Sequence, residues 1–163
     1  MDRLSKEHRS WNMGRIRSAN TTPEIRVRSI LHRLGYRFRL HSKELPGRPD
    51  IVLAKWRHVV FVHGCFWHRH ASCKFCSTPK SRIEFWAAKF ERTVERDKAV
   101  EGKLRGMGWQ VTVVWECELA DEEKLVSRLA AAIRTPVTLT SSIGRLGKAC
   151  SEKPDQNSGA PYV

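Results

Sequence analysis

Cysteine and histidine gather in one short stretch of this sequence. Between residues 63 and 76 lie three of the chain's five cysteines and three of its seven histidines. They are His63, Cys65, His68, His70, Cys73 and Cys76. Thiolate and imidazole groups are the usual ligands of zinc, and an odd number of cysteines argues against a disulfide framework. The stretch therefore predicts a bound metal ion.

A single acid offers a second kind of chemistry. Asp50 follows Pro-Gly-Arg-Pro and opens a predicted strand, so its carboxylate lies at a strand end, near the end of the next strand. Carboxylate oxygens suit Mg²⁺, which can activate water for phosphodiester hydrolysis. Pro49 and Asp50 resemble the first half of the PD-(D/E)xK nuclease motif, but Phe61 and His63 stand where its second acid and lysine are expected. By itself, a Pro-Asp pair is more often part of a turn.

Another acid lies on the apolar side of a long helix predicted over residues 82–105. Ile83, Phe90 and Leu104 define the apolar stripe, and Asp97 follows Phe90 by seven residues, at nearly the same angular position. A carboxylate on this side needs a partner. We expect one of the clustered histidines, whose tautomer Asp97 would then fix.

Two adjacent aromatic residues interrupt the Cys/His cluster. Phe66 and Trp67 lie in a predicted loop, where consecutive side chains cannot both point into one core. Trp86 lies near the start of the long helix and borders its apolar stripe, so it fits core packing nearly as well as a surface role.

The first element that must support these residues is a helix ending before Gly35. Thr22 is the expected N-cap and Pro23 suits the first helical position. The residues expected on its apolar side are Ile25, Ser29, Ile30, Leu31, His32 and Leu34. Those expected outside are Arg26, Arg28 and Arg33.

Period-two and β-branched segments predict four strands, over 36–40, 50–54, 58–64 and 109–115. The first strand has Tyr36, Phe38 and Leu40 on one face. The second and third are expected to form a hairpin, and the last is expected to be buried. Ser81 and Glu84 predict a capping box for the long helix, and a final helix covers 121–134. The order α-β-β-β-α-β-α predicts an α/β fold with a mixed central sheet flanked by helices.

Charge indicates the kind of partner. The 163 residues include 30 Lys and Arg against 17 Asp and Glu, a net charge of +13 that favours a polyanion such as nucleic acid. No run is long enough to span a membrane and the N-terminus lacks a signal-peptide core, so we expect a cytoplasmic protein. We predict a basic arm over residues 1–20, one domain over 21–135 and a disordered tail over 136–163.

Taken together, the motifs resemble the very-short-patch-repair (Vsr) DNA mismatch endonucleases. LPGRPD, HGCFWHRHASC, EFW, ERD and VVWEC occur in the family's order, and the resemblance runs from Met13 to Leu119. It implies a restriction-endonuclease-like fold. It also implies that Asp50 and the backbone carbonyl of Val62 bind catalytic Mg²⁺, that His68 activates water and that His63 assists at the scissile phosphate. Glu24 matches a glutamate that faces the active site, although an acid in a helix's first turn is common without a catalytic role.

The resemblance further implies a structural zinc site built by Cys65, His70, Cys73 and Cys117. The family usually has His-x-Cys where His70 and Cys73 are separated by two residues, so Cys76 is an alternative to Cys73. The histidines His63 and His68 could themselves ligate zinc. Cys150, in the tail, is expected to be a free thiol.

For recognition, the resemblance implies that Phe66, Trp67 and Trp86 insert into the base stack beside a T:G mispair. Asp97 belongs to the ERD motif, whereas Thr93 replaces a frequent family asparagine and leaves that residue's metal contact in doubt.

The implied activity is nicking of duplex DNA 5′ of the T in a T:G mispair, the product of 5-methylcytosine deamination. The expected protein is a monomer that uses Mg²⁺ and zinc, and recruitment of a mismatch-repair partner is left open, as are the flanking bases. Two alternatives remain from the residues alone: a general PD-(D/E)xK-like nuclease, and a zinc-stabilised DNA-binding module without catalysis.

Overall fold

The computed structural model describes residues 5, 8, 11, 14, 15 and 19–134. Its helices are α2 (Thr22–Arg33), α3 (Ile83–Gly106) and α4 (Glu122–Arg134), and its strands are β1 (Arg39–Leu40), β2 (Ile51–Leu53), β3 (His58–His63) and β4 (Gln110–Trp115). Two short 3₁₀ segments, η1 (Ala54–Trp56) and η2 (Glu116–Ala120), complete the described part. The predicted order of helices and strands is confirmed over these residues. The tail over 136–163 and most of the basic arm lie outside them.

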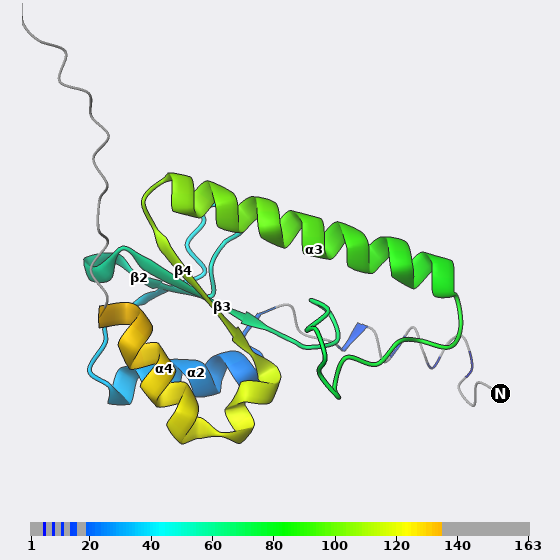
Figure 1. Cartoon of the computed structure of the whole chain (residues 1–163), viewed down its shortest axis with the longest axis horizontal. Helices are drawn as coiled ribbons and strands as arrows, with labels where there is room; N and C mark the ends of the chain where they lie inside the picture. The colour runs from blue at the N-terminus through cyan, green and yellow to red at the C-terminus, as the bar shows by residue number, and fades with distance from the viewer. Residues whose placement is uncertain (1–4, 6–7, 9–10, 12–13, 16–18, 135–163) are drawn as a thin grey trace, which may run out of the picture.

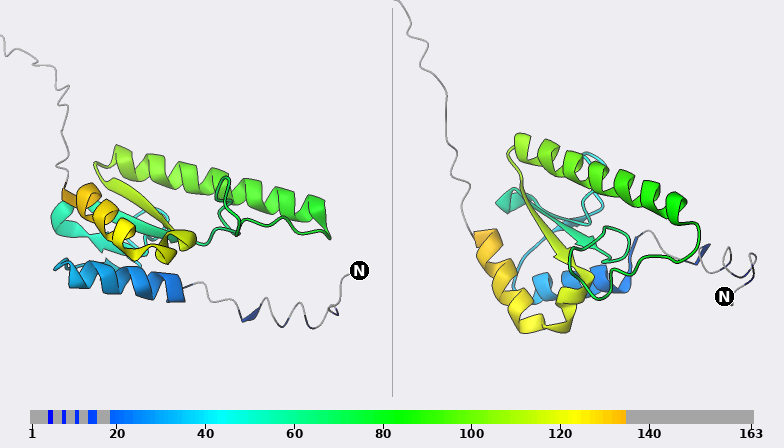
Figure 2. Two further views of the ribbon diagram at one scale, coloured as in Figure 1. Left: turned by 60° about the horizontal axis from the view of Figure 1, so that its bottom comes forward. Right: turned by 45° about the vertical axis from the view of Figure 1, so that its right-hand side comes forward.

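The four strands form one mixed sheet in the order β1-β2-β3-β4. The predicted hairpin is confirmed, because β2 pairs with β3 antiparallel, with Ile51 opposite Val60, whereas β3 and β4 run parallel. Helix α3 covers one face of the sheet, and α2 and α4 cover the other (Figures 1 and 2). The long crossover through α3 is what a parallel pair of neighbouring strands requires.

Each face of the sheet has its own apolar core. The larger core joins the sheet to α2 and α4 and includes Ile30, Leu53, Val60, Leu129 and Ile133. A smaller one beneath α3 is centred on Val52, Val59 and Leu104. Alternate residues of β2 and β3 supply the two cores, as expected for a sheet covered on both faces.

The N-cap of helix α2 lies one residue earlier in the sequence than expected. Thr21, not Thr22, is the N-cap, and it forms a capping box with Glu24, as an acid three residues after a threonine allows. The predicted buried side was also wrong in part: Glu24 and Val27 are buried, whereas the Ile25 side chain is 52% exposed. Arg28, expected outside, is largely buried because it pairs with Glu24.

Three other sequence predictions need correction. The capping box at Ser81 and Glu84 is not formed; Arg82 occupies the N-cap position with φ 53° and no side-chain cap. Only two of the five residues predicted for the first strand pair as β1, and Leu40 is exposed while Tyr36 is buried. Strand β4 lies at an edge of the sheet, so its residues alternate between buried and half-buried instead of being buried throughout.

Candidate active site

Asp50 is held at the end of the β2–β3 hairpin. It precedes β2 by one residue, and its Oδ2 accepts a hydrogen bond of 2.8 Å from the backbone N–H of Val62 in β3. Burial raises the pKa of Asp50 above its usual value; the Val62 N–H opposes that shift and the nearby Glu24 adds to it. The hairpin therefore fixes one carboxylate oxygen and leaves the other, Oδ1, facing the neighbouring helix and turn.

Glu24 and His41 complete an acidic cluster with Asp50. One ligand atom from each of the three lies within 4.8 Å of the others. Glu24 is buried in the first turn of α2, where the N–H groups of Asn20 and Thr21 donate to its carboxylate and Arg28 Nη2 lies 2.7 Å from Oε2. The sequence reasoning missed His41, which immediately follows β1; only the pairing of β1 with β2 brings it beside Asp50.

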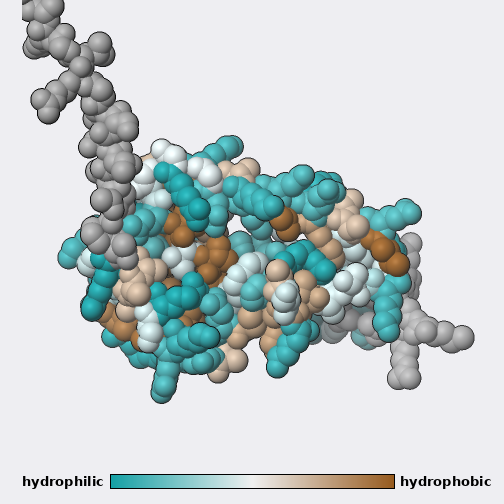
Figure 3. Space-filling view, in the orientation of Figure 1, coloured by the Kyte–Doolittle hydropathy of each residue, from teal (hydrophilic) through white to brown (hydrophobic). Residues whose placement is uncertain are grey.

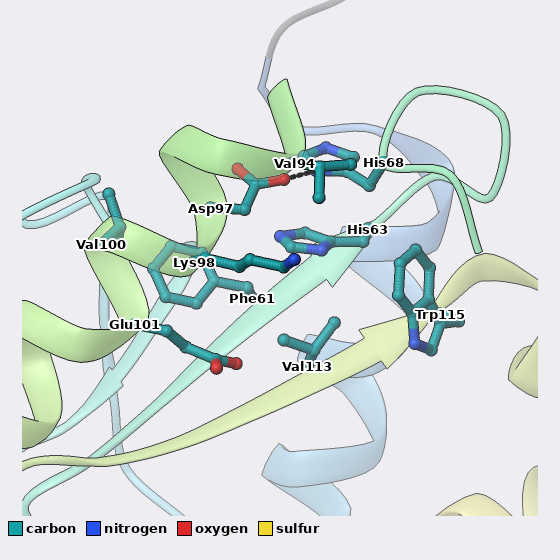
Figure 4. A pocket seen from close by; sticks show the side chains of 10 residues that line it. All are labelled: Phe61, His63, His68, Val94, Asp97, Lys98, Val100, Glu101, Val113 and Trp115. Carbon is teal, nitrogen blue, oxygen red and sulfur yellow. Dashed lines mark hydrogen bonds and ion pairs between the residues drawn. The ribbon is translucent and has the colours of Figure 1, made fainter. Parts of the chain in front are cut away.

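A second cluster forms on the α3 side of β3. His68 Nδ1 lies 2.6 Å from Asp97 Oδ2, as the position of Asp97 on the helix led us to expect. The His63 ring stacks on His68 with centroids 3.7 Å apart and planes 10° from parallel (Figure 4). The second oxygen of Asp97 accepts from the guanidinium of Arg96 at 2.9 Å.

The surroundings decide which of these groups carries charge. Burial, reinforced by the neighbouring His68, lowers the pKa of His63 from its ordinary 6.5 to about 4. For Asp97, burial favours the neutral acid, but hydrogen bonds with His68 and Arg96 outweigh it and lower the pKa of the carboxyl below its usual value. At neutral pH the cluster thus holds an uncharged His63 beside an ionised Asp97.

A small cavity of about 170 Å³ opens beside these histidines, between α3 and the strands β3 and β4. Figure 3 shows apolar surface in the hollow beneath α3. Most of its lining is apolar, from Phe61, Val94, Val113 and Trp115. Such walls limit the water around the His–Asp pair and strengthen its electrostatic interaction.

The two clusters meet at consecutive residues of β3. Val62 bonds Asp50 through its backbone, and His63 stacks on His68. Because the Val62 N–H lies in the plane of the sheet while the His63 side chain points toward α3, a single strand end holds a carboxylate site and an imidazole site next to each other. Such an arrangement can bind a divalent cation on one side and move a proton on the other.

A third cluster contains sulfur. Cys65, His70, Cys73 and Cys117 place one ligand atom each within 4.8 Å of one another, and Cys76 is not a member of this group among the described residues. His70 Nδ1 lies 3.6 Å from Cys65 Sγ and 3.3 Å from Cys117 Sγ. A tetrahedral zinc ion with ordinary bond lengths separates such atoms by about 3.5 Å, so the residues fit zinc. Burial raises the pKa of the Cys65 thiol to about 12.

The cluster joins segments distant in sequence. Three of its members lie in the loop that follows β3, and Cys117 lies in η2, just after β4. The His70 ring also stacks on Trp115 at the end of β4, with centroids 4.2 Å apart and planes 3° from parallel. The loop is therefore tied to the parallel strand pair that also supports His63.

Phe66 and Trp67 of this loop gather with Trp86 of α3. Phe66 lies 5.0 Å from Trp67 and 5.6 Å from Trp86, measured between ring centroids. All three are half-buried, with the buried Phe90 beneath Phe66 and Trp86. Lys89 Nζ lies 5.4 Å from the rings of both tryptophans. Trp86 thus combines a packing contact with partial exposure.

Comparison with known proteins assigns the family. Residues 1–74 match the family model described as "DNA mismatch endonuclease Vsr". A type II nicking enzyme, V.XorIIP, from Xanthomonas oryzae pv. oryzae is 54% identical over 128 residues, which cover 78% of this chain and 93% of the relative. The DNA mismatch endonuclease Vsr of Escherichia coli is 45% identical over 120 residues, or 74% of this chain and 76% of the relative. The chain therefore belongs to the Vsr family of DNA mismatch endonucleases and is a DNA endonuclease.

Proposed function

We propose that this endonuclease nicks duplex DNA on the 5′ side of the T in a T:G mispair by Mg²⁺-dependent hydrolysis. The observation that carries the proposal is the meeting of a carboxylate cluster and a His–Asp pair at Val62 and His63. A metal-bound phosphate on one side and a proton acceptor on the other are what phosphodiester hydrolysis needs. The restriction-endonuclease-like ancestry suggested by the sequence agrees with such a site at a strand end.

The residues around Asp50 fit a hard divalent cation. Asp50 and Glu24 offer carboxylate oxygens, and burial together with the second acid raises the pKa of Asp50, a penalty that a cation removes. Asp50 and the backbone carbonyl of Val62 would hold Mg²⁺, with Glu24 facing it. When bound, the ion lowers the pKa of water and neutralises charge on the phosphate.

His68 acts as the general base in this proposal. Its Nδ1 bonds the ionised Asp97, so Nδ1 carries the ring proton and Nε2 is left to accept a proton from water. The Asp97 carboxylate also holds the ring in this orientation, as in other His–Asp pairs. The neutral His63, stacked against it, would contact the scissile phosphate without adding a second positive charge.

The sulfur cluster is proposed to hold structural zinc. Three cysteines and one histidine fill a tetrahedral shell and leave no position for substrate water. The ion would fix the loop that carries Phe66 and Trp67.

Mismatch selection is assigned to the aromatic residues. Phe66, Trp67 and Trp86 are half-buried and lie within contact of one another, so they can act as a single wedge. A mismatched step is easier to unstack than a paired one, which favours insertion beside T:G. Deamination of 5-methylcytosine supplies that mispair.

The deciding experiment compares nicking of two duplexes that differ only in a T:G or T:A pair, with and without Mg²⁺. We expect Mg²⁺-dependent nicking of the T:G duplex alone. Equal cleavage of both duplexes would identify a general nuclease, and binding without cleavage would identify a non-catalytic DNA-binding module.

Asp50→Asn tests the metal site. Asparagine keeps the size of the side chain and loses its charge, so nicking should fall at least about 100-fold while binding of the T:G duplex changes little. Both are measured on the purified variant, with unfolding compared by circular dichroism. Cleavage close to wild type would remove Asp50 from the site.

A further inference from the structure

His41 lies at the centre of the acidic cluster, although neither the sequence motifs nor the proposed mechanism assign it a role. Its backbone has φ 47°, a conformation that costs a residue other than glycine free energy. Its backbone N–H points to the carbonyl of Asp50 at 3.5 Å, next to the β1–β2 pairing. The turn therefore places the His41 ring between Glu24 and Asp50.

The ring has a charged or polar neighbour at each nitrogen. Nε2 lies 3.0 Å from Arg28 Nη2 and 3.8 Å from Glu24 Oε2. Nδ1 lies 4.0 Å from Asp50 Oδ1, the oxygen that Val62 leaves unbonded. The His41 side chain is 31% exposed, so solvent reaches the site.

Arg28 decides the tautomer of this ring. A guanidinium group has donors and no acceptor, so a nitrogen 3.0 Å from it must supply a lone pair. The ring proton of a neutral His41 is then on Nδ1 and faces Asp50. Neither nitrogen keeps a lone pair for a metal ion, which distinguishes His41 from a direct ligand.

We propose, building on the function above, that His41 is a positioning residue for the metal-binding carboxylate of Asp50. Val62 N–H holds Oδ2, and His41 Nδ1–H fixes Oδ1 through one bridging water or a small rotation across the 4.0 Å gap. An oxygen held in this way still has a second lone pair for the cation. Arg28 in turn bonds both Glu24 and His41, so the two acids are oriented by one connected network.

The test uses the full-length protein and Mn²⁺ as a spectroscopic probe. His41→Ala removes the donor, and His41→Gln restores an N–H of similar reach; both variants carry a β-carbon at the same positive φ, so their comparison separates the donor from backbone strain. His32→Ala, at an exposed histidine in the last turn of α2, is the matched control. Mn²⁺ affinity is measured by electron paramagnetic resonance. Affinity for the T:G duplex is measured without metal, and the nicking rate is measured as a function of Mg²⁺ concentration.

Removing a residue that hydrogen-bonds a metal ligand typically lowers metal affinity about 10-fold or more. We therefore expect His41→Ala to lower Mn²⁺ affinity about 10-fold or more and to leave DNA affinity unchanged. His41→Gln should recover most of it, and His32→Ala should match wild type. Nitrogen-15 spectra of the wild type should show the proton on Nδ1.

Wild-type Mn²⁺ affinity in His41→Ala would overturn the inference and leave the proposed function intact. A His41→Gln variant as weak as His41→Ala would also overturn it, because a donated N–H would then not be what matters. Failure of the wild type to bind Mn²⁺ or to nick would instead remove the proposed function as well.

Discussion

At the scale of single residues, the stacked histidines restrict where positive charge can lie. Two imidazolium rings 3.7 Å apart would repel each other strongly in a partly buried site. Asp97 bonds His68 through Oδ2 and Arg96 through Oδ1, and because the pKa of His63 is lowered to about 4, His63 is neutral at pH 7. In the proposed mechanism the two rings therefore have different roles: His68 accepts the proton, and His63 offers hydrogen bonds without changing charge.

The neutral state of His63 predicts a loss of stability in acid. Its pKa is lowered from 6.5 to about 4 in the folded protein, so between these values the unfolded chain binds more protons than the folded one. Stability contributed by this residue is present above pH 6.5 and is lost as the pH falls toward 4. The loss between pH 7 and 5 should be about 2 kcal/mol. Urea unfolding of wild type and His63→Gln at both pH values measures it.

His63→Gln should lose less stability than wild type over the same interval, because glutamine does not titrate. Acid also weakens cysteine–metal bonding, but that effect is common to both proteins and cancels in the comparison. Equal losses in the two proteins would show that His63 is not held neutral by the fold.

Single residues also show which parts of the site were visible in the sequence. Asp97 was placed correctly because helical periodicity puts it on the inner side of α3, where it meets His68. His41 was missed because no periodic pattern points to it. Its position depends on the pairing of β1 with β2 and on a left-handed backbone conformation that is uncommon for residues other than glycine.

At the scale of helices and strands, the apolar patterns of the sequence predicted which helices and strands exist better than where each one ends. The hairpin of β2 and β3 and the helix α4 follow from β-branched runs and amphipathic spacing. The ends of a helix depend on which residue caps it, and two neighbouring residues can both be suitable caps. Thr21 prevailed over Thr22 because Glu24 can reach back to it, and Arg82 replaced the expected Ser81 cap, its guanidinium lying over the ring of Phe85.

The Cys/His cluster in the loop after β3 distinguishes two cysteines that spacing left equivalent. Cys73 shares the cluster with His70, whereas Cys76 is bonded to Cys73 only through its backbone N–H. Cys73→Ser should therefore lose bound zinc and several degrees of melting temperature, as expected when metal binding is coupled to folding. Cys76→Ser is the matched control and should retain about one zinc per chain. Metal analysis and thermal unfolding of both variants check this.

The opposite pattern, with zinc lost from Cys76→Ser and kept in Cys73→Ser, would exchange the two ligands. If natively purified wild type contains zinc and neither variant loses it, the zinc site must lie outside this loop. Cys117→Ser should behave like Cys73→Ser, since Cys117 attaches the loop to the end of β4.

At the scale of the whole molecule, two kinds of DNA contact are separable. The excess of basic residues, +13 in net charge, attracts any duplex and is sensitive to salt. The group formed by Phe66, Trp67 and Trp86 is local, and its residues come from the Cys/His loop and from α3. Among the described residues no helix is long and apolar enough to cross a lipid bilayer. In the proposed function, charge therefore supplies affinity for DNA, and the three aromatic residues supply the choice of site.

Removing one wedge residue should separate these contributions. Stacking on an aromatic side chain is worth roughly 1–3 kcal/mol per base, and unstacking a step costs a few kcal/mol, so insertion succeeds only where the DNA opens easily. Trp67→Ala should lose most of its preference for T:G over T:A duplex but keep weak, salt-sensitive binding. Trp56→Ala, at a partly exposed tryptophan of η1, is the control. Binding to both duplexes is measured at one salt concentration. If Trp67→Ala weakens both equally, its ring only packs and recognition lies elsewhere.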